Sequence, residues 1–353
     1  MWRENAVYPI NDEQIVVTAP LFNTTKKLKQ TVSEAFANEK FTHVIAGGEA
    51  AVYPAAVARR LVGARQSPTT TALRCRDKLA MKQYLSDYDV PMTRFLAESS
   101  VTSPAEAFAY LGAPLVRKQR KAYGGRSFEM FRREQDLVLK KNGRNILEKF
   151  VPAPEASIES YVNNGEIKFV NTTSYLEKGH VNLVPSALDA TLQADMQSLN
   201  RKVIEALKIN WGITHLEVYL TGNGLLFGEI ALRPPGGYIM NAMTHAYGFD
   251  AWRAFVAMEL GEHFDFPKSA ALYSCVEVLH PGVGQISAIR GEQLARSHAA
   301  VREFRLKVKT GDIISKREGA GQDVGYLLYT SETPAARIEL YHYFKQQFAI
   351  DIQ

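Results

Sequence analysis

A pair of alternating segments, separated by a glycine-containing turn, constrains the fold of this chain more than any other feature. Residues 213–220 and 225–232 each alternate in the manner of a β-strand. Two such runs around a short glycine turn predict an antiparallel hairpin. A three-residue loop over 222–224 is a common hairpin connection that places glycine in the left-handed conformation. This register pairs Glu217 with Glu229, both on one face of the sheet.

The two paired glutamates indicate a site for a cation. Carboxylates directly opposite each other lie roughly 5 Å apart at Cβ, and they repel each other unless a proton or a cation intervenes. Oxygen ligands alone favour Mg²⁺. Arg233 follows on the same face and adds a fork of hydrogen-bond donors, so the three side chains together indicate phosphate chemistry. The alternative is an ordinary hairpin with scattered surface charges: a loop of Asn223-Gly224 alone would place Glu217 opposite Ile230.

Composition describes a globular protein of ordinary type. The chain has 353 residues, of which 46% are hydrophobic and 22% charged, so two or three domains are expected. No apolar run approaches the ~20 residues of a membrane helix, and the N-terminus lacks the features of a secretory signal. Cys75 and Cys275 give neither a disulfide framework nor a zinc-binding spacing. We therefore expect a cytoplasmic protein with buried free thiols and no membrane partner.

The charge balance is mildly basic. The chain has 42 Lys and Arg against 37 Asp and Glu, with a net charge of +5 and a pI near 9.0. This balance suits anionic small molecules as well as weak contact with nucleic acid. The densest basic cluster covers residues 117–121 with Arg126 nearby, and by itself it indicates a solvated basic face.

The N-terminal segment predicts a small α/β domain. Residues 41–46 have the composition of a buried strand, the glycine pair 47–48 forms a turn, and 54–62 form a helix with proline near its start. These elements in that order favour a parallel arrangement. The glycine pair alone indicates a packing turn, and the polar stretch 66–71 is predicted as a loop and is a candidate domain boundary.

The rest of the chain alternates helices and strands. Helices are predicted over 77–88, 194–207, 251–260 and 335–348, and strands over 114–118, 128–131 and 145–151. A basic, glycine-containing loop over 119–127 joins the first two of these strands. A further hairpin is predicted over 158–170, and short strands with glycines dominate from residue 270 onward.

In this order the elements resemble the ATP-grasp superfamily of ligases over nearly the whole chain. The segment from Glu229 to Gly237 resembles the family's Glu-x-Asn-x-Arg-x-x-Gly-Gly pattern. The resemblance implies an α/β (α+β) chain with the ATP-grasp fold and a two-lobed nucleotide-binding centre. The implied domains are a Rossmann-like preATP-grasp domain over 1–72, the ATP-grasp domain over 73–270 with a lid subdomain at about 112–175, and a small β-rich C-terminal domain with a closing helix over 271–353.

The resemblance also implies an ATP site. Lys78 and Lys118 match lysines that contact the nucleotide phosphates, and Glu155 matches the carboxylate that bonds the ribose hydroxyls. The glycine loop would fold over the phosphates, because glycine lets backbone N–H groups approach closely. The basic cluster is therefore interpreted as a phosphate lid, and nucleic acid is not expected as a partner. The loop comprises Gly124, Gly125, Arg126 and Ser127, and the hinge that pairs with adenine comprises Glu148, Lys149, Phe150 and Val151.

Metal ligands and a catalytic arginine follow from the same resemblance. Glu217 and Glu229 match the ligands of Mg²⁺, for one or two ions, with Mn²⁺ as a substitute. Arg233 matches the arginine that stabilises the transferring phosphoryl group or the tetrahedral intermediate, and Lys118 offsets negative charge beside it. Ala231 departs from the family pattern, because many members carry asparagine there, and it puts full coordination of a second ion in doubt.

Substrate-binding positions are less specific. Backbone N–H groups of Gly236 and Gly237 are candidates for holding the substrate carboxylate or an oxyanion. Lys178, His180 and Asn241 are candidates for the acceptor pocket, although each singly is better explained as an ordinary polar residue.

The implied activity is that of an ATP-dependent carboxylate–amine ligase. The carboxylate of an amino acid or small acid attacks the γ-phosphate of ATP and forms an acyl phosphate with loss of ADP, and an amine then displaces phosphate. The tail from Tyr273 resembles the C-terminal domain of biotin-carboxylase-like and amino-acid-ligase members. The segment after Arg233 lacks the His-Asn-Ser run of purine-pathway carboxylating members, which favours amino-acid ligation.

Two alternatives stay open on the same fold. One is a purine-pathway-type carboxylating enzyme, and the other is a non-catalytic nucleotide-binding sensor, which Ala231 supports. The expected partners are small-molecule carboxylate and amine substrates, and a homodimer is a weak expectation from the family alone.

Overall fold

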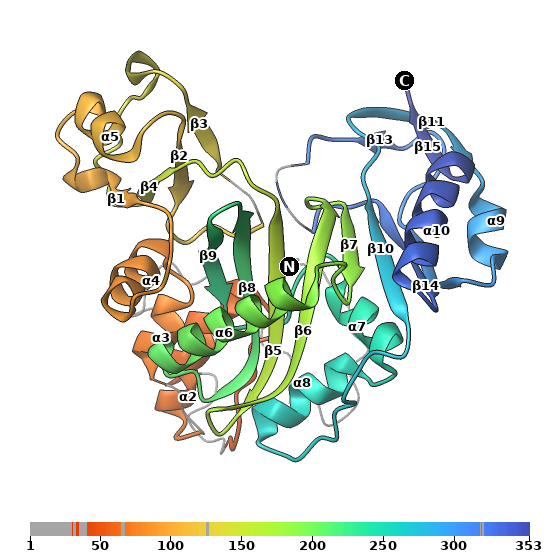
Figure 1. The fold of residues 1–353 in the computed structure, drawn as a ribbon, viewed down its shortest axis with the longest axis horizontal. Coiled ribbons are helices and arrows are strands. Elements are labelled where there is room, and N and C mark those ends of the chain that lie inside the picture. The colour runs from red at the N-terminus through yellow and green to blue at the C-terminus, as the bar shows by residue number, and fades with distance from the viewer. Residues whose placement is uncertain are drawn as a thin grey trace.

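The computed structural model describes residues 41–64, 68–124, 127–317 and 321–353, together with Gln30, Ser33, Glu34 and Gly319. Within them the chain builds three β-sheets flanked by helices (Figure 1). This mixed architecture confirms the predicted fold class. In the described part of the chain no helix has the length and apolar character needed to cross a membrane.

The largest sheet forms the centre of the molecule (Figure 1). Its strands pair in the order β12-β14-β10-β7-β6-β5-β8-β9, each antiparallel to its neighbours. The hairpin predicted over 158–170 is confirmed, because Asn163 pairs with Glu166 across its turn. The strands are β5 Glu155–Asn163, β6 Glu166–Glu177, β7 Val181–Val184, β8 Trp211–Thr221, β9 Gly224–Ala231, β10 Tyr273–Leu279, β12 Val301–Leu306 and β14 Gly325–Ser331.

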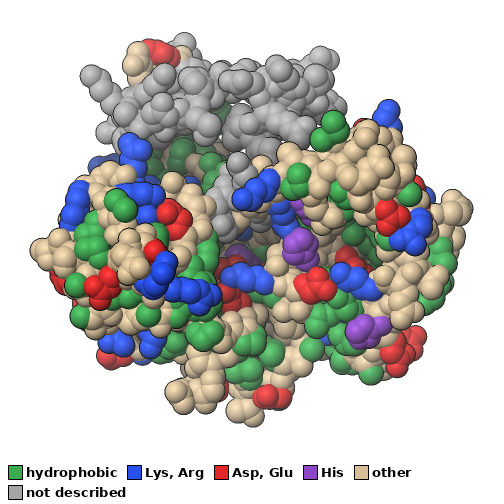
Figure 2. All heavy atoms as spheres, turned by 90° about the horizontal axis from the view of Figure 1, so that it is seen from above, with side chains coloured by type: hydrophobic (Ala, Val, Ile, Leu, Met, Phe, Trp, Pro, Cys, Tyr) green, Lys and Arg blue, Asp and Glu red, His purple; other side chains and the backbone are tan. Residues whose placement is uncertain are grey.

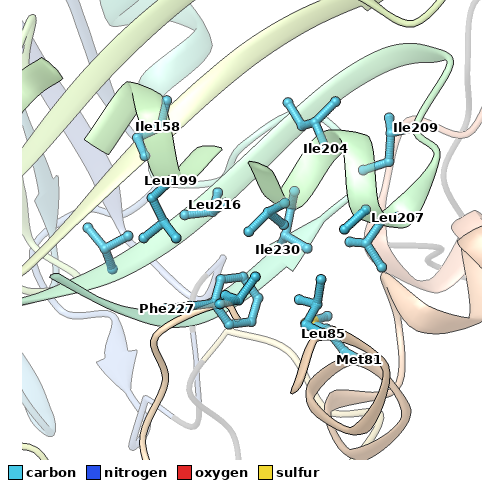
Figure 3. Packing of buried hydrophobic residues seen from close by; sticks show 14 of the residues in the cluster. Met81, Leu85, Ile158, Leu199, Ile204, Leu207, Ile209, Leu216, Phe227 and Ile230 are labelled. Atoms are coloured by element: carbon cyan, nitrogen blue, oxygen red, sulfur yellow. The ribbon is translucent and has the colours of Figure 1, made fainter. Parts of the chain in front are cut away.

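Helices cover both faces of this sheet. Side chains alternate along β5, so Ile158 packs in a cluster with α6 and α4, whereas Tyr161 packs in another cluster with α7 and α8. Figure 3 shows the first cluster, in which Leu207 of α6 lies near Leu85 of α4 and Ile230 of β9. Each fully buried aliphatic side chain of this kind contributes roughly 1.5–3 kcal/mol. The helices are α4 Lys78–Leu85, α6 Ala190–Leu207, α7 Ile239–Tyr247 and α8 Ala251–Leu260.

A smaller sheet, called the lid sheet here because a lid subdomain is predicted for this region, lies at one side of the molecule (Figure 1). Its strands pair in the order β1-β4-β2-β3, and α5 packs on it through Ala107 and Leu111. The predicted strands over 114–118, 128–131 and 145–151 all lie in this sheet. The elements are β1 Phe95–Ala97, β2 Leu115–Gln119, β3 Glu129–Phe131, β4 Asn145–Lys149, α5 Pro104–Leu111 and the 3-10 turns η3 Glu98–Ser100 and η4 Glu134–Asp136.

The C-terminal segment continues the central sheet and adds a small one. Strands β10, β12 and β14 extend the central sheet beyond residue 271, so this predicted boundary does not coincide with a break between sheets. The predicted closing helix is α10, and it packs on β10 and β14 through Tyr341 and Phe344. The remaining elements are β11 Gly284–Arg290, α9 Glu292–Ser297, β13 Ile313–Ile314, α10 Pro334–Gln347 and β15 Ala349–Ile352.

Two predictions for the N-terminal segment were wrong. Residues 41–46 form no strand, because none of the described strands pairs with them. Residues 69–71, predicted as loop, belong to a helix that begins after Pro68. The helix predicted over 77–88 ends in a 3-10 turn and has Asp77 as its N-cap, whose carboxylate accepts from the amides of Leu79 and Ala80. The elements are η1 Glu49–Ala51, α2 Val52–Leu61, α3 Thr69–Arg74 and η2 Ser86–Tyr88.

Candidate active site

A cleft of about 820 Å³ contains nearly all the predicted site residues. This volume is in the range of small-molecule sites. Viewed from above, charged and histidine side chains gather around the central hollow (Figure 2). The predicted residues that line the cleft are Lys78, Lys118, Gly124, Glu148, Lys149, Phe150, Val151, Glu155, Lys178, Glu217, Glu229, Arg233, Gly236, Gly237 and Asn241. Ser127 and His180 do not line it, and Gly125 and Arg126 lie outside the described residues.

The acidic hairpin has the predicted pairing but reaches it in a different way. Glu217 pairs with Glu229, as expected. The loop, however, has two residues, because Thr221 pairs with Gly224. A β-bulge between Glu217 and Val218 supplies the missing shift of register. The extra residue is Gly228, where an added Cβ would lie 2.9 Å from the carbonyl oxygen of Glu217, so a side chain does not fit there.

Glu217 is held ionised by a buried histidine. The Nε2 atom of His215 lies 3.5 Å from a carboxylate oxygen of Glu217, and its Nδ1 atom lies 2.9 Å from fully buried Glu159. Burial lowers the pKa of His215, but the bonds to Glu159 and Glu217 outweigh it and raise the pKa to about 9. Burial raises the pKa of Glu217, but His215 outweighs that effect and lowers it to about 2. Tyr175 Oη also donates to Glu217 over 3.4 Å.

Glu229 faces a lysine at the start of α4. The Nζ atom of Lys78 lies 2.6 Å from Oε2 of Glu229, and it also donates to the carbonyl of Ala122 over 2.9 Å. Within the described residues no group of three or more His, Cys, Asp or Glu side chains is placed to hold a metal ion. Two cross-strand carboxylates in a cleft nevertheless suit Mg²⁺, because this ion keeps few protein ligands and completes its shell with water and phosphate oxygens.

The side chain of Glu148 has a role that the sequence did not predict. The prediction used its backbone as part of an adenine-binding hinge, whereas its side chain is buried between two lysines. Lys82 Nζ lies 2.8 Å from one carboxylate oxygen and Lys118 Nζ lies 2.7 Å from the other. Burial raises the pKa of Glu148, but the two lysines lower it to about 2. Burial likewise lowers the pKa of Lys118, but Glu148 outweighs it and holds that pKa above its usual range.

Two arginines of the basic cluster over 117–121 are paired with buried carboxylates, and the interpretation of the cluster as a phosphate lid stays a prediction. Arg117 is buried and its guanidinium donates to the fully buried carboxylate of Glu98. Arg120 forms a bidentate pair with Asp77, with both N–O distances at 2.8 Å. Of these basic residues Lys118 lines the cleft.

The predicted ribose and acceptor residues have polar partners. Lys178 Nζ donates to Glu155. Burial and the charge of Glu217 raise the pKa of Glu155, and together they outweigh the charge of Lys178, which lowers it. Asn241 Nδ2 donates to Glu303 over 2.9 Å. His180 Nε2 lies 3.2 Å from a nitrogen of Arg317, beside the cleft rather than in its lining.

The segment after the hairpin joins the N-terminal part of the chain. Arg233 Nε donates to Glu49 over 2.7 Å, and Glu49 also lies 3.4 Å from Arg76. Asn182 Nδ2 donates to the carbonyl of Gly237 over 2.9 Å. Gly237 has φ of 61°, a left-handed conformation that favours glycine, and an added Cβ would lie 2.7 Å from that nitrogen, so the Asn182 side chain would have to move.

Several residues that line the cleft, or that pair with residues of its lining, were not predicted from the sequence. Lys82 had a usable signal, since it follows Lys78 by one helical turn and therefore lies on the same face of α4. His215 had one too, because it lies two positions before Glu217 on the same strand face. No local signal predicted Glu49 or Asn182, because segments distant in the sequence bring them to the site. The same holds for three cleft residues of the C-terminal segment, Lys307, Arg317 and Asp323.

Two family models match the chain. The ATP-grasp domain matches residues 83–244, and the L-amino acid ligase C-terminal domain 2 matches residues 278–351. Both matches agree with the fold and the cleft described above.

Individual relatives point the same way. The chain is 24% identical to an L-arginine-specific L-amino acid ligase of Bacillus subtilis over 86% of this chain and 79% of that protein. It is 27% identical to N5-carboxyaminoimidazole ribonucleotide synthase of Synechococcus elongatus over 59% of this chain and 56% of that protein. The crystal structure of an L-amino acid ligase from Bacillus licheniformis superposes with a TM-score of 0.78 at 18% identity, covering 96% of this chain and 87% of that one. The chain therefore contains an ATP-grasp domain followed by the C-terminal domain of L-amino acid ligases, and this combination supports ATP-dependent carboxylate–amine ligation.

Proposed function

We propose that the chain joins the carboxylate of one amino acid to the amino group of another, with both reaction steps inside the 820 Å³ cleft. The observation that carries this proposal is the gathering of two glutamates, two lysines and an arginine from separate elements around one cavity. These residues are Lys78, Lys118, Glu217, Glu229 and Arg233. Simple nucleotide binding does not require this arginine, so the set favours catalysis over a sensor.

ATP would lie between the lid sheet and the central sheet. The hinge residues 148–151 line the cleft and would face adenine, and Glu155 would accept from the ribose hydroxyls. Lys78 and Lys118 would contact the phosphates. Both lysines have carboxylate partners in this structure, so phosphate would take over ion pairs that already exist in the cleft.

Mg²⁺ would be held by Glu217 and Glu229. Their cross-strand pairing and oxygen-only chemistry fit this ion, and Mn²⁺ has the same ligand preference. Bound there, the ion supplies charge neutralisation for phosphate oxygens. Ala231 adds no oxygen ligand, so further ligands would have to come from water or from the nucleotide.

The chain's own contribution to the reaction is positioning and charge. A carboxylate oxygen of the first substrate attacks the γ-phosphorus, the bond to the β,γ-bridging oxygen breaks, and ADP leaves. The amine nitrogen of the second substrate then attacks the acyl carbon, loses a proton, and phosphate leaves. Arg233 and Lys118 would stabilise the negative charge in these steps, and the amides of Gly236 and Gly237 would hold the oxyanion. Closure of residues 119–127 would exclude water, which otherwise hydrolyses the acyl phosphate.

The C-terminal match supports amino acids as substrates. It names the L-amino acid ligase C-terminal domain 2, and this segment contributes Lys307, Arg317 and Asp323 to the cleft. Charged groups of both signs suit a zwitterionic substrate, which presents a carboxylate and an ammonium group. The Bacillus subtilis relative is specific for L-arginine, which makes arginine the first amino acid to test. The domain boundaries, a cytoplasmic location and a homodimer stay predictions.

Phosphate release from ATP and Mg²⁺ over amino acids, singly and in pairs, tests the proposal. We expect phosphate only with particular pairs, and mass spectrometry should show a product lighter than their sum by one water. Bicarbonate with an aminoimidazole ribonucleotide serves as the comparison reaction. Phosphate release with bicarbonate and not with any amino-acid pair would contradict the proposal and favour a carboxylating enzyme.

A further inference from the structure

A buried ion cluster lies directly behind the phosphate-facing lysine. Lys82 is 1% exposed and Glu148 is 2% exposed. Lys82 Nζ lies 2.8 Å from Oε1 of Glu148, and Lys118 Nζ lies 2.7 Å from Oε2. Each lysine therefore engages its own carboxylate oxygen. The two lysines differ in surroundings, because Lys118 lines the cleft whereas Lys82 does not.

Helix α4 places its two lysines between the two lobes. Lys78 and Lys82 are one turn apart on the same helix face. Lys78 pairs with Glu229 of the central sheet, and Lys82 pairs with Glu148 of the lid sheet. The two pairs differ in exposure: the Glu229 side chain is 31% exposed and that of Glu148 is 2% exposed. Water can replace a lost partner at Glu229 but not at Glu148.

Glu148 competes with ATP for Lys118. Binding of a phosphate oxygen would draw the Lys118 ammonium away from the carboxylate. A buried carboxylate that loses its partner is strongly destabilised, so a lone Glu148–Lys118 pair would hold the lysine back. Lys82 changes this balance, because it keeps one oxygen of Glu148 paired whichever way Lys118 points.

We propose that Lys82 is a positioning residue for ATP: it neutralises Glu148 permanently and so releases Lys118 to the nucleotide phosphates. The inference rests on the proposed phosphate contact of Lys118. Without Lys82, the buried carboxylate would keep Lys118 for itself. Affinity for phosphate groups would then fall, whereas affinity for the nucleoside part would not change.

Binding affinity of purified variants tests this role. The probes are a β,γ-imido analogue of ATP with Mg²⁺, and adenosine, which has no phosphate. We expect Lys82→Met to weaken binding of the analogue by about tenfold or more and to leave adenosine binding unchanged. The double variant Lys82→Met/Glu148→Gln removes both buried charges and should recover the analogue affinity to within about threefold. Lys82→Gln replaces Lys82→Met if the latter does not fold.

Two controls separate this inference from the proposed function. Lys202→Met alters an exposed lysine on α6 that donates to the carbonyl of Asp89, and it should leave both affinities unchanged. Lys118→Ala should weaken binding of the analogue; unchanged affinity there would overturn the phosphate contact and the inference with it. Weakening in Lys118→Ala with none in Lys82→Met would overturn the inference alone. Equal losses for adenosine and the analogue, or no recovery in the double variant, would show that Lys82 only maintains structure.

Discussion

The acidic hairpin of β8 and β9 and the basic strand β2 are both rich in charge, but they place it differently. In the hairpin, Glu217 and Glu229 both line the cleft. In the strand, consecutive side chains separate: Lys118 lines the cleft, whereas Arg117 points into the lid and pairs with buried Glu98. Charges spaced for one sheet face therefore meet at a site, and charges adjacent in sequence do not.

The difference shows why a cluster of like charges is a poor guide to a binding surface. Alternation sends Arg117 and Lys118 to opposite faces of a sheet, and Arg120 is bound by Asp77 at the start of α4. The charge density that suggested a basic face is thus divided among a lid interior, a helix cap and the cleft. Substitutions can test this division, because those in one region should lower stability and those in the other should lower turnover.

Replacement of Arg117 should cause the largest loss, and the loss should be of stability. Arg117→Ala leaves Glu98 fully buried without its cation, which costs about 3–5 kcal/mol. Urea unfolding measures this free energy. Lys118→Ala should cost little stability, since Glu148 keeps Lys82, but it should abolish tight ATP binding. A stability loss of similar size in both variants would contradict the different roles of Arg117 and Lys118 on the two faces of β2.

Replacement of a hairpin carboxylate should lower turnover rather than stability. Glu229→Gln keeps the shape of the side chain but removes a charge at the proposed metal site. We expect the rate of phosphate release to fall by at least about a hundredfold, the scale of a lost electrostatic stabiliser. The thermal midpoint should change little, because the Glu229 side chain is 31% exposed. Glu166→Gln, at the exposed start of β6, is the matched control. Near-normal turnover in Glu229→Gln would remove Glu229 from the mechanism.

The same comparison explains what the sequence could predict. Helices α8 and α10, the β5–β6 hairpin and the Glu217–Glu229 pairing follow from local patterns. The strand over 41–46 did not form within the described residues, because a strand exists only through a hydrogen-bonded neighbour that local pattern cannot identify. The ion pairs of Glu148 and Arg233 could not be predicted for a similar reason, because their partners Lys82 and Glu49 come from other elements.

The combination of loop and bulge that sets the register of the hairpin could not be predicted from local rules either. Loop length alone predicted three residues, whereas the structure uses a two-residue loop and a bulge at Gly228. Both give the same pairing of the carboxylates. A glycine inside an alternating strand is the signal that would have found the bulge.

Gly228→Ala should disturb the pairing of the two carboxylates. Its Cβ would lie 2.9 Å from the carbonyl oxygen of Glu217, so the bulge must shift. We expect a loss of about 1–3 kcal/mol in stability and a fall in turnover of about tenfold, measured by urea unfolding and phosphate release. Gly222→Ala, in the loop of the same hairpin, is the control, because nothing lies within 4 Å of its added Cβ. Equal effects at both positions would argue that the bulge does not set the register.

The smallest expected effect is a pH dependence from Glu148, the acidic partner that the basic strand retains. Its pKa falls from 4.5 to about 2 in the folded protein, where burial opposes ionisation but Lys118 and Lys82 outweigh it. A lowered pKa stabilises the fold above pH 4.5, and that stabilisation is lost as pH falls from 4.5 toward 2. By pH 4 the loss is about 1 kcal/mol. The variant Lys82→Met/Glu148→Gln lacks this carboxylate, so the difference between its unfolding free energy and that of the unaltered chain should shift by about this amount between pH 6 and pH 4. If this difference in unfolding free energy does not change between pH 6 and pH 4, the two lysines do not hold Glu148 ionised. The buried charges beside the basic strand would then not differ in electrostatic effect from the more exposed charges of the acidic hairpin.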